Sequence, residues 1–204
     1  MSEFIFGVDL DGVCGDYTGA LRRVLAQKRQ VSELSLPRAV TWDFKEWGLA
    51  TREDYLELHA EAVRKRRIFA NMDPMEHCAE VLWRLSDAGV WIRLITHRLI
   101  GKDGHAIAVA DTCTWLDAHD IPYRDICFLG NKPQVEANVY VDDAPHNVEA
   151  LRAAGNHVVV FDQPYNRGFG GMRAHNWLEV ESHVMGLYEQ FLKDGLADAS
   201  SVVS

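Results

Sequence analysis

The stretch EFIFGVDLDGVCGDY, residues 3–17, predicts the first strand of this chain and a candidate site directly after it. Its apolar run from Phe4 to Val8 has no strict polar alternation, which is typical of a strand covered on both faces. The run ends at two aspartates one residue apart, Asp9 and Asp11, and Gly12 follows. Alone, this pattern also fits a polar turn with a glycine. The ends of the other strands therefore decide whether the two carboxylates form part of a site.

Further apolar segments predict four more strands, over residues 90–96, 125–129, 139–141 and 157–161. Helical patterns fall between or after these strands, over residues 78–88, 106–119, 147–154 and 177–193. Strands that alternate with helices indicate βαβ units and a parallel sheet. We therefore predict an α/β fold, with a five-stranded parallel sheet flanked by helices.

Residues 16–77 break this alternation, because they contain helical patterns and no convincing strand. We interpret them as a small helical cap inserted after the first strand, above the carboxyl edge of the sheet. The predicted domains are a core of residues 1–15 and 78–196 and a cap of residues 16–77. Residues 197–204 are predicted to form a flexible tail.

The composition narrows the classes of function. With 204 residues and 48% hydrophobic residues, the chain can bury a real core. A net charge of −9 argues against binding to a nucleic-acid polymer, which selects basic surfaces. Four cysteines without a CxxC pair favour reduced thiols over a zinc cage or a disulfide framework. No signal peptide or membrane-spanning run is visible, so we expect a cytoplasmic protein without a membrane partner.

Polar residues at the other strand ends complete a chemical pattern. Thr96 ends the second strand in LITHR, Lys132 follows the third in LGNKP, and Asp142 and Asp143 follow the fourth in VYVDD. In open parallel sheets the carboxyl ends of strands share one edge, where ligands bind. Converging carboxylates favour a hard cation such as Mg²⁺, while hydroxyl and ammonium groups suit a phosphoryl group. An aspartate there can attack phosphorus, and a second carboxyl can transfer the proton.

Each of these features has an ordinary structural explanation when taken alone. The threonine could be structural, the lysine solvated, and the paired aspartates an N-cap of the next helix. The basic run RKRR, residues 64–67, fits a solvated helix face in an acidic protein better than a nucleic-acid site. Four such features in order at successive strand ends favour the site.

The four motifs DLDGV, LITHR, GNKP and VYVDD resemble those of the haloacid dehalogenase (HAD) superfamily of phosphatases. The cap position, the segment RIFANMDPMEHCAEVLWRL and the segment FDQPYNR further resemble the 5′(3′)-deoxyribonucleotidase family. The resemblance implies a HAD-like Rossmannoid core, Mg²⁺ as cofactor and a nucleoside monophosphate as substrate. It also suggests a homodimer.

The resemblance implies a role for each motif residue. Asp9 would be the nucleophile, and Asp11 the general acid and base with its carbonyl on the metal. Thr96 and Lys132 would hold the phosphate, and Asp142, Asp143 or both would complete the metal site. The threonine of the second motif is often followed by serine and proline in the family, whereas His97 and Arg98 stand here. We include His97 among the phosphate-binding candidates, and the change leaves the nucleotide preference open.

The predicted cap is rich in aromatic residues, which could stack on a nucleobase or simply form the core of the cap. The candidate pocket residues are Asp16, Trp42, Phe44, Trp47, Phe69, Arg98 and Lys102.

The resulting hypothesis is a Mg²⁺-dependent phosphatase that hydrolyses (deoxy)nucleoside monophosphates through an aspartyl-phosphate. One alternative is a HAD phosphatase for another small phosphate ester or for a nucleic-acid 3′-phosphate. A non-enzymatic alternative is a domain that binds a phosphate ligand or accepts a phosphoryl group. Receiver domains use similar groups, but their phosphoacceptor follows the third strand, where Lys132 stands here.

Overall fold

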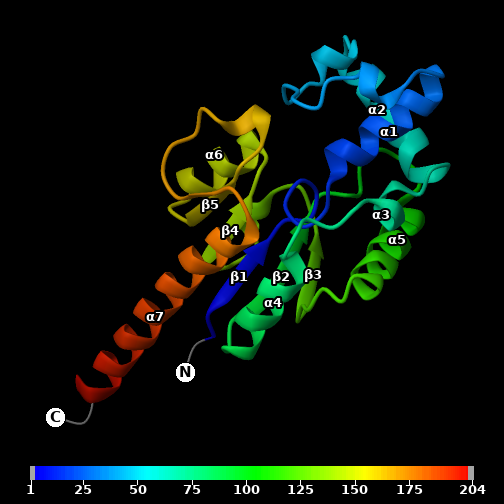
Figure 1. Cartoon of the computed structure of the whole chain (residues 1–204). Coiled ribbons are helices and arrows are strands. Elements are labelled where there is room, and N and C mark those ends of the chain that lie inside the picture. The colour runs from blue at the N-terminus through cyan, green and yellow to red at the C-terminus, as the bar shows by residue number, and fades with distance from the viewer. Residues whose placement is uncertain (1–2, 202–204) are drawn as a thin grey trace.

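The computed structural model describes residues 3–201 and contains one parallel sheet, which confirms the predicted α/β fold (Figure 1). The sheet has the order β3-β2-β1-β4-β5-β6. The bounds of its strands are β1 (Ile5–Val8), β2 (Trp91–Thr96), β3 (Asp125–Phe128), β4 (Val139–Asp142), β5 (His157–Phe161) and β6 (Arg173–Ala174). The prediction of five strands is therefore corrected to six. The sixth was missed because two residues carry no readable pattern, although they pair in parallel with Val160 and Phe161.

Helices cover both faces of the sheet and create two apolar cores. The helices α4 (Cys78–Asp87), α5 (His105–Ala118) and α7 (Trp177–Ser201) contribute to the larger core, and α6 (Pro145–Ala153) to the smaller one. Alternate residues of β4 serve different cores: Val139 and Val141 pack into the larger one and Tyr140 into the smaller. Burial on both faces explains why the strands show no polar alternation.

The helix α7 is longer than the sequence pattern predicts. It continues to Ser201, past the start of the predicted tail at residue 197, and residues 202–204 of that tail lie outside the described residues. Figure 1 shows this helix extending along and beyond the sheet. Across residues 3–201, no helix is both long and apolar enough to cross a lipid bilayer.

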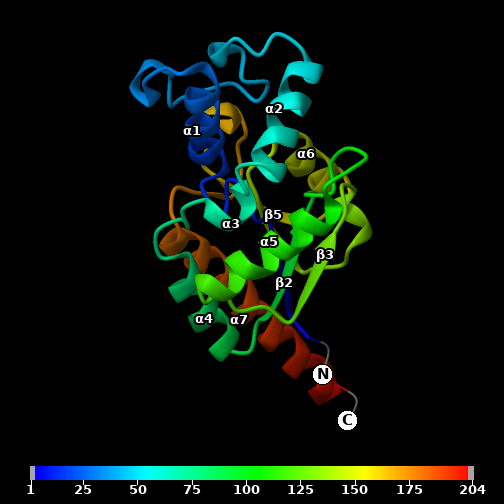
Figure 2. The same cartoon turned by 90° about the vertical axis from the view of Figure 1, so that its right-hand side faces the viewer.

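The insertion, residues 16–77, lies above the carboxyl ends of β1 and β2 (Figures 1 and 2). It contains α1 (Tyr17–Arg29), α2 (Arg52–Arg64) and α3 (Ile68–Asn71), with short 3₁₀ turns between α1 and α2. Side-chain caps define where the two long helices begin. Asp16 accepts a hydrogen bond from the Gly19 amide at 2.8 Å, and Thr51 forms a capping box with Asp54. Side chains of the insertion itself therefore determine where these two helices begin.

Aromatic rings hold the irregular part of the insertion together. The Trp47 side chain is buried, stacks on Phe44 with ring centroids 4.9 Å apart, and donates a hydrogen bond from Nε1 to the Pro37 carbonyl at 2.8 Å. The Phe44 ring also stacks on Tyr55 of α2. These contacts tie residues 37–48, which contain only one short 3₁₀ turn, to a regular helix.

We predict that Trp47→Ala destabilises the protein far more than Trp42→Ala. Removing a buried indole costs about 3–5 kcal/mol through lost contacts and the cavity left behind. Trp42 is 44% exposed, so the same truncation there removes much less buried surface. Urea unfolding of the two variants measures the difference, and equal losses would contradict this account of the insertion's core.

Candidate active site

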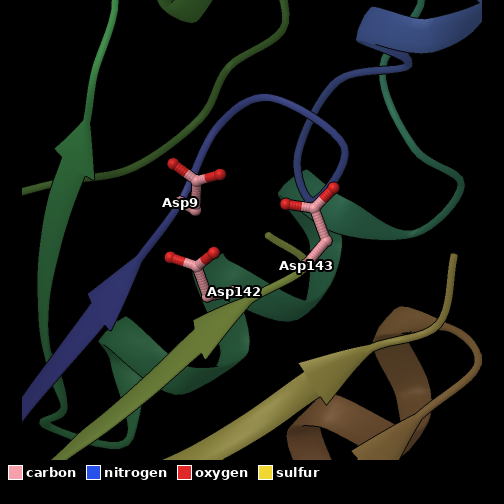
Figure 3. A group of neighbouring side chains, drawn as sticks. All are labelled: Asp9, Asp142 and Asp143. Atoms are coloured by element: carbon pink, nitrogen blue, oxygen red, sulfur yellow. The ribbon is translucent and has the colours of Figure 1, made fainter. Parts of the chain in front are cut away.

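The nucleophile candidate Asp9 is placed by the pairing between β1 and β4. Its amide donates to the Val141 carbonyl at 3.1 Å, which continues the strand register one step beyond Val8. Because β1 and β4 are neighbours, Asp9 lies opposite the aspartates that end β4. Figure 3 shows the carboxylates of Asp9, Asp142 and Asp143 directed toward one another.

These three carboxylates form a compact, buried cluster. One oxygen from each lies within 4.8 Å of the others. Lys132, also buried, reaches the cluster from the turn after β3, and its Nζ lies 2.6 Å from both Asp9 and Asp142. Asp142 also accepts hydrogen bonds from the Ala144 amide and the Asn147 side chain. Lys132 therefore forms ion pairs with two of the three carboxylates, Asp9 and Asp142.

Burial and mutual repulsion change the pKa values of this cluster. Desolvation, assisted by the charges of Asp142 and Asp11, raises the pKa of Asp9 from its ordinary value of 3.8 to about 7, although Lys132 opposes the shift. The pKa of Asp143 is also raised, first by burial and then by repulsion from Asp9 and Asp142. Burial alone would lower the pKa of Lys132, but its two aspartate partners raise it. The ammonium stays charged, and the protein by itself does not stabilise all three carboxylates as anions.

Asp143 is held by a segment that follows β5. Tyr165 donates a hydrogen bond from its hydroxyl to the Asp143 carboxylate, and Asn166 donates to the Asp143 carbonyl at 2.8 Å. On the other side lies Gly12, which has a φ of +84° and whose missing Cβ would be 2.0 Å from an Asp143 oxygen. A side chain at residue 12 would therefore displace this carboxylate, which gives the glycine of DLDGV a steric reason.

The cluster fits a divalent cation. Its charges are unbalanced, its donors are oxygens from carboxylates, and two of its members have raised pKa values without a cation. The residues that would hold Mg²⁺ are Asp9, Asp142 and Asp143. The side chain of Asp11 is not part of this cluster, and its predicted metal contact through the backbone carbonyl stays a prediction.

Thr96 has an unsatisfied hydroxyl group at the same edge of the sheet. Its side chain is fully buried, and within residues 3–201 its Oγ1 has no hydrogen-bond partner. Buried hydroxyl groups are nearly always paired, because leaving one unpaired is costly. An oxygen-rich ligand such as a phosphate would supply the missing acceptor.

Asp11 is bound by Arg98 rather than by the cluster. Arg98 donates from Nε and Nη2 to the two carboxylate oxygens of Asp11, at 3.1 and 2.7 Å. The guanidinium is completely buried, whereas the Asp11 side chain is 24% exposed. Arg98 is one of the predicted pocket residues. The structure places it behind Asp11, outside the lining of the cavity that lies between the carboxylates and the insertion.

A cavity of about 490 Å³ opens between the carboxylates and the insertion. Of the predicted site residues, its lining includes Asp9, Asp11, Trp42, Phe44, His97, Lys132 and Asp143. The structure does not bring Asp16, Trp47, Phe69, Thr96, Arg98, Lys102 or Asp142 into that lining. Asp16 caps α1, and Trp47 and Phe69 are buried in the apolar core.

Several lining residues were not among the predicted site residues. They are Tyr17, Tyr55, His59, His146, Asn147 and Tyr165. Tyr165 carries a signal in the sequence, because it lies within the FDQPYNR segment on which the family resemblance partly rests. His59 lies on a helical pattern, where the sequence does not tell which face is turned to the cavity. In the structure its Nδ1 lies 2.8 Å from the Tyr17 hydroxyl, so two helices of the insertion meet at the cavity wall.

Comparison with solved structures shows which proteins share this fold. A haloacid dehalogenase-like hydrolase of Streptococcus pneumoniae superposes with a TM-score of 0.60 at 12% identity, covering 89% of this chain and 98% of that one. A structure titled "Putative Phosphatase" from Clostridium difficile has a TM-score of 0.58 at 14% identity, covering 90% and 100%. The chain thus shares its fold with these hydrolases.

Comparison of the sequence with known families and proteins identifies the family to which the chain belongs. The family model described as 5′ nucleotidase, deoxy (pyrimidine), cytosolic type C matches residues 3–189, and the chain belongs to this family of phosphoric monoester hydrolases. A Chlorobaculum tepidum protein named "Putative 5′(3′)-deoxyribonucleotidase" is 41% identical over 181 residues, which are 88% of this chain and 89% of that protein. The 5′(3′)-deoxyribonucleotidase of Bacillus subtilis is 23% identical over 147 residues, covering 71% and 77%.

We predict that replacing Asp9 by asparagine stabilises the metal-free protein, and more so at pH 8 than at pH 5. A carboxyl whose folded pKa is raised favours folding below its unfolded pKa, and this contribution is lost as the pH rises from about 4 to about 7. Asparagine removes this pH dependence and still offers an oxygen to Lys132. Urea unfolding in EDTA at the two pH values measures the gap between variant and wild type. A stability difference that does not widen with pH would contradict the raised pKa of Asp9 in the folded protein.

Proposed function

We propose that this protein is a Mg²⁺-dependent phosphatase that hydrolyses (deoxy)nucleoside monophosphates to nucleoside and phosphate through an aspartyl-phosphate. The observation that carries the proposal is the carboxyl edge of the sheet, where buried carboxylates and a buried hydroxyl group lack sufficient partners. Asp9 and Lys132 form an ion pair there and line a cavity with aromatic walls, and the buried Thr96 hydroxyl at the end of β2 has no hydrogen-bond partner among the described residues. The family of this chain and the names of its relatives support the same reaction.

Asp9 is the proposed nucleophile. Its carboxylate attacks phosphorus, an aspartyl–phosphate bond forms, and the bond between phosphorus and the nucleoside oxygen breaks. Asp11 donates a proton to that leaving oxygen. In the second half of the reaction, Asp11 takes a proton from water as the water attacks phosphorus. Phosphate then leaves, and Asp9 returns to its carboxylate form.

The other groups of the site bind charge. Lys132 is fixed between Asp9 and Asp142, so it presents an ammonium where phosphate oxygens would lie. The Thr96 hydroxyl, which is buried and has no hydrogen-bond partner among the described residues, is the proposed donor to one of these oxygens. When bound, Mg²⁺ would neutralise the converging anions and favour the ionised form of Asp9. Asp9, Asp142 and Asp143 would hold it.

The cavity wall suggests where a nucleoside would bind. Trp42 and Phe44 of the insertion and Tyr165 of the core line it, and Trp42 contacts Tyr165 edge-to-face with ring centroids 5.2 Å apart. Flat apolar faces bind a nucleobase by stacking. A volume of about 490 Å³ is within the range of small-molecule sites. A polymer is a poor fit to a chain of net charge −9.

The first test is phosphate release from ribo- and deoxyribonucleoside 5′- and 3′-monophosphates and from sugar phosphates, with Mg²⁺. We expect release from nucleotides, with Asp9→Asn reducing turnover about a thousandfold or more while the protein stays folded. Release from sugar phosphates alone would keep the chemistry and reject the nucleotide. A folded, fully active Asp9→Asn variant would reject the nucleophile.

We also predict that EDTA abolishes turnover and that Mg²⁺ restores it. Asp143→Asn removes one carboxylate of the cluster, so it should raise the Mg²⁺ concentration for half-maximal activity by about tenfold or more. A second readout is the melting temperature, which Mg²⁺ should raise in the wild type more than in the variant. Activity that is indifferent to EDTA would remove the metal from the proposal.

A further inference from the structure

The pair formed by Arg98 and Asp11 joins three parts of the fold. Asp11 lies on the loop after β1, Arg98 on the loop after β2, and the guanidinium carbon of Arg98 lies 4.3 Å from the ring centre of Phe69 in α3 of the insertion. We propose that Arg98 is a positioning residue for the reaction: it fixes the Asp11 carboxylate beside Asp9 so that Asp11 can transfer the proton. This inference rests on the proposed function.

The contacts of Asp11 show why Arg98 carries this role. Within residues 3–201, every hydrogen bond received by the Asp11 carboxylate comes from Arg98. Two parallel donors of a planar guanidinium fix both the position and the plane of a carboxylate. Asp11 and Asp9 both line the cavity, and the charge of Asp11 acts on Asp9. The Asp11 side chain thus stays partly accessible, at 24% exposure, while Arg98 holds it.

Arg98 itself has little freedom to move. Its Nη1 donates to the Thr112 hydroxyl oxygen at 2.9 Å, and that hydroxyl in turn donates to the Ala108 carbonyl at 2.6 Å. Its Nη2 also lies 3.7 Å from the Met72 sulfur. With Phe69 over its face, the guanidinium is held by α5 and by the insertion at once. A group with such support can hold a second group in a fixed geometry.

The alternative is that Arg98 only anchors the insertion. Another arginine already does this: Arg67, at the start of α3, donates to Asp111 of α5 from Nε at 2.8 Å. That pair joins the insertion to the same helix but contacts neither Asp11 nor the cavity lining. Arg67 is therefore a matched control for a purely structural effect.

The test compares substrates that differ in their need for a proton. The oxygen of a nucleoside needs protonation to leave, whereas nitrophenolate is a stable anion. The constant kcat/KM reports only steps up to phosphoryl transfer. With Mg²⁺-loaded enzyme, we expect Arg98→Met to lower kcat/KM for a deoxyribonucleoside 5′-monophosphate about a hundredfold. For p-nitrophenyl phosphate the loss should be less than about tenfold.

A double-mutant cycle tests whether the effect passes through Asp11. Asp11→Asn should show the same substrate selectivity, and Asp11→Asn with Arg98→Met should be no slower than Asp11→Asn alone. Arg98→Lys should recover part of the loss, because lysine keeps the charge but not the paired donors. If Arg98→Met does not fold, Arg98→Lys carries the same comparison. Arg67→Lys should leave the ratio between the two substrates unchanged.

Equal losses for both substrates would overturn the inference, as would losses that multiply in the double variant or a ratio that Arg67→Lys also shifts. These outcomes are distinct from failure of the proposed function. That failure would be a wild-type enzyme that releases no phosphate from the nucleotide, whatever the variants do.

Discussion

Asp9, Asp142 and Asp143 repel one another, so neighbouring parts of the fold must hold them together. Three carboxylates with oxygens within 4.8 Å of one another are buried with one lysine between them. Such a cluster is stable in the folded protein only if other groups hold it in place. The pairing of β1 with β4 fixes its geometry, and the segment after β5 holds Asp143 in place. Burying these carboxylates without a cation is costly, which distinguishes the cluster from an ordinary polar surface.

Burial of this edge depends on the insertion, which makes the two parts of the chain one functional unit. The core alone would leave the carboxyl ends of its strands in water, where charges interact weakly. The insertion adds the wall that carries Trp42, Phe44 and Tyr55, and so encloses the cavity. Its own stability comes from a separate set of contacts around Trp47. Trp42 lines the cavity and Trp47 is buried in the core of the insertion, whereas Phe44 takes part in both.

Sequence reasoning predicted the parallel fold and the four strand-end groups, because one rule places the carboxyl ends of parallel strands at one edge. It could not separate Trp42 from Trp47, because residues 37–51 contain only a short 3₁₀ turn and therefore no period that assigns faces. It missed β6 because a strand of two residues is too short to give a pattern. It missed His146 because the sequence at the start of α6 is equally consistent with a solvent-exposed helix end. Local sequence patterns predict helices and strands. Which side chains of an irregular segment face the cavity depends instead on tertiary packing.

The dipeptide His97–Arg98 shows what tertiary structure adds. The sequence marked both residues as a departure from the usual pattern and placed both near the phosphate. In the structure they separate: His97 is exposed at the cavity, above Gly130, where a Cβ would lie only 3.0 Å from its ring. Arg98 turns inward to Asp11 and Phe69. A buried guanidinium requires a fixed anionic partner, so its burial beneath the insertion and the position of Asp11 are a single structural requirement.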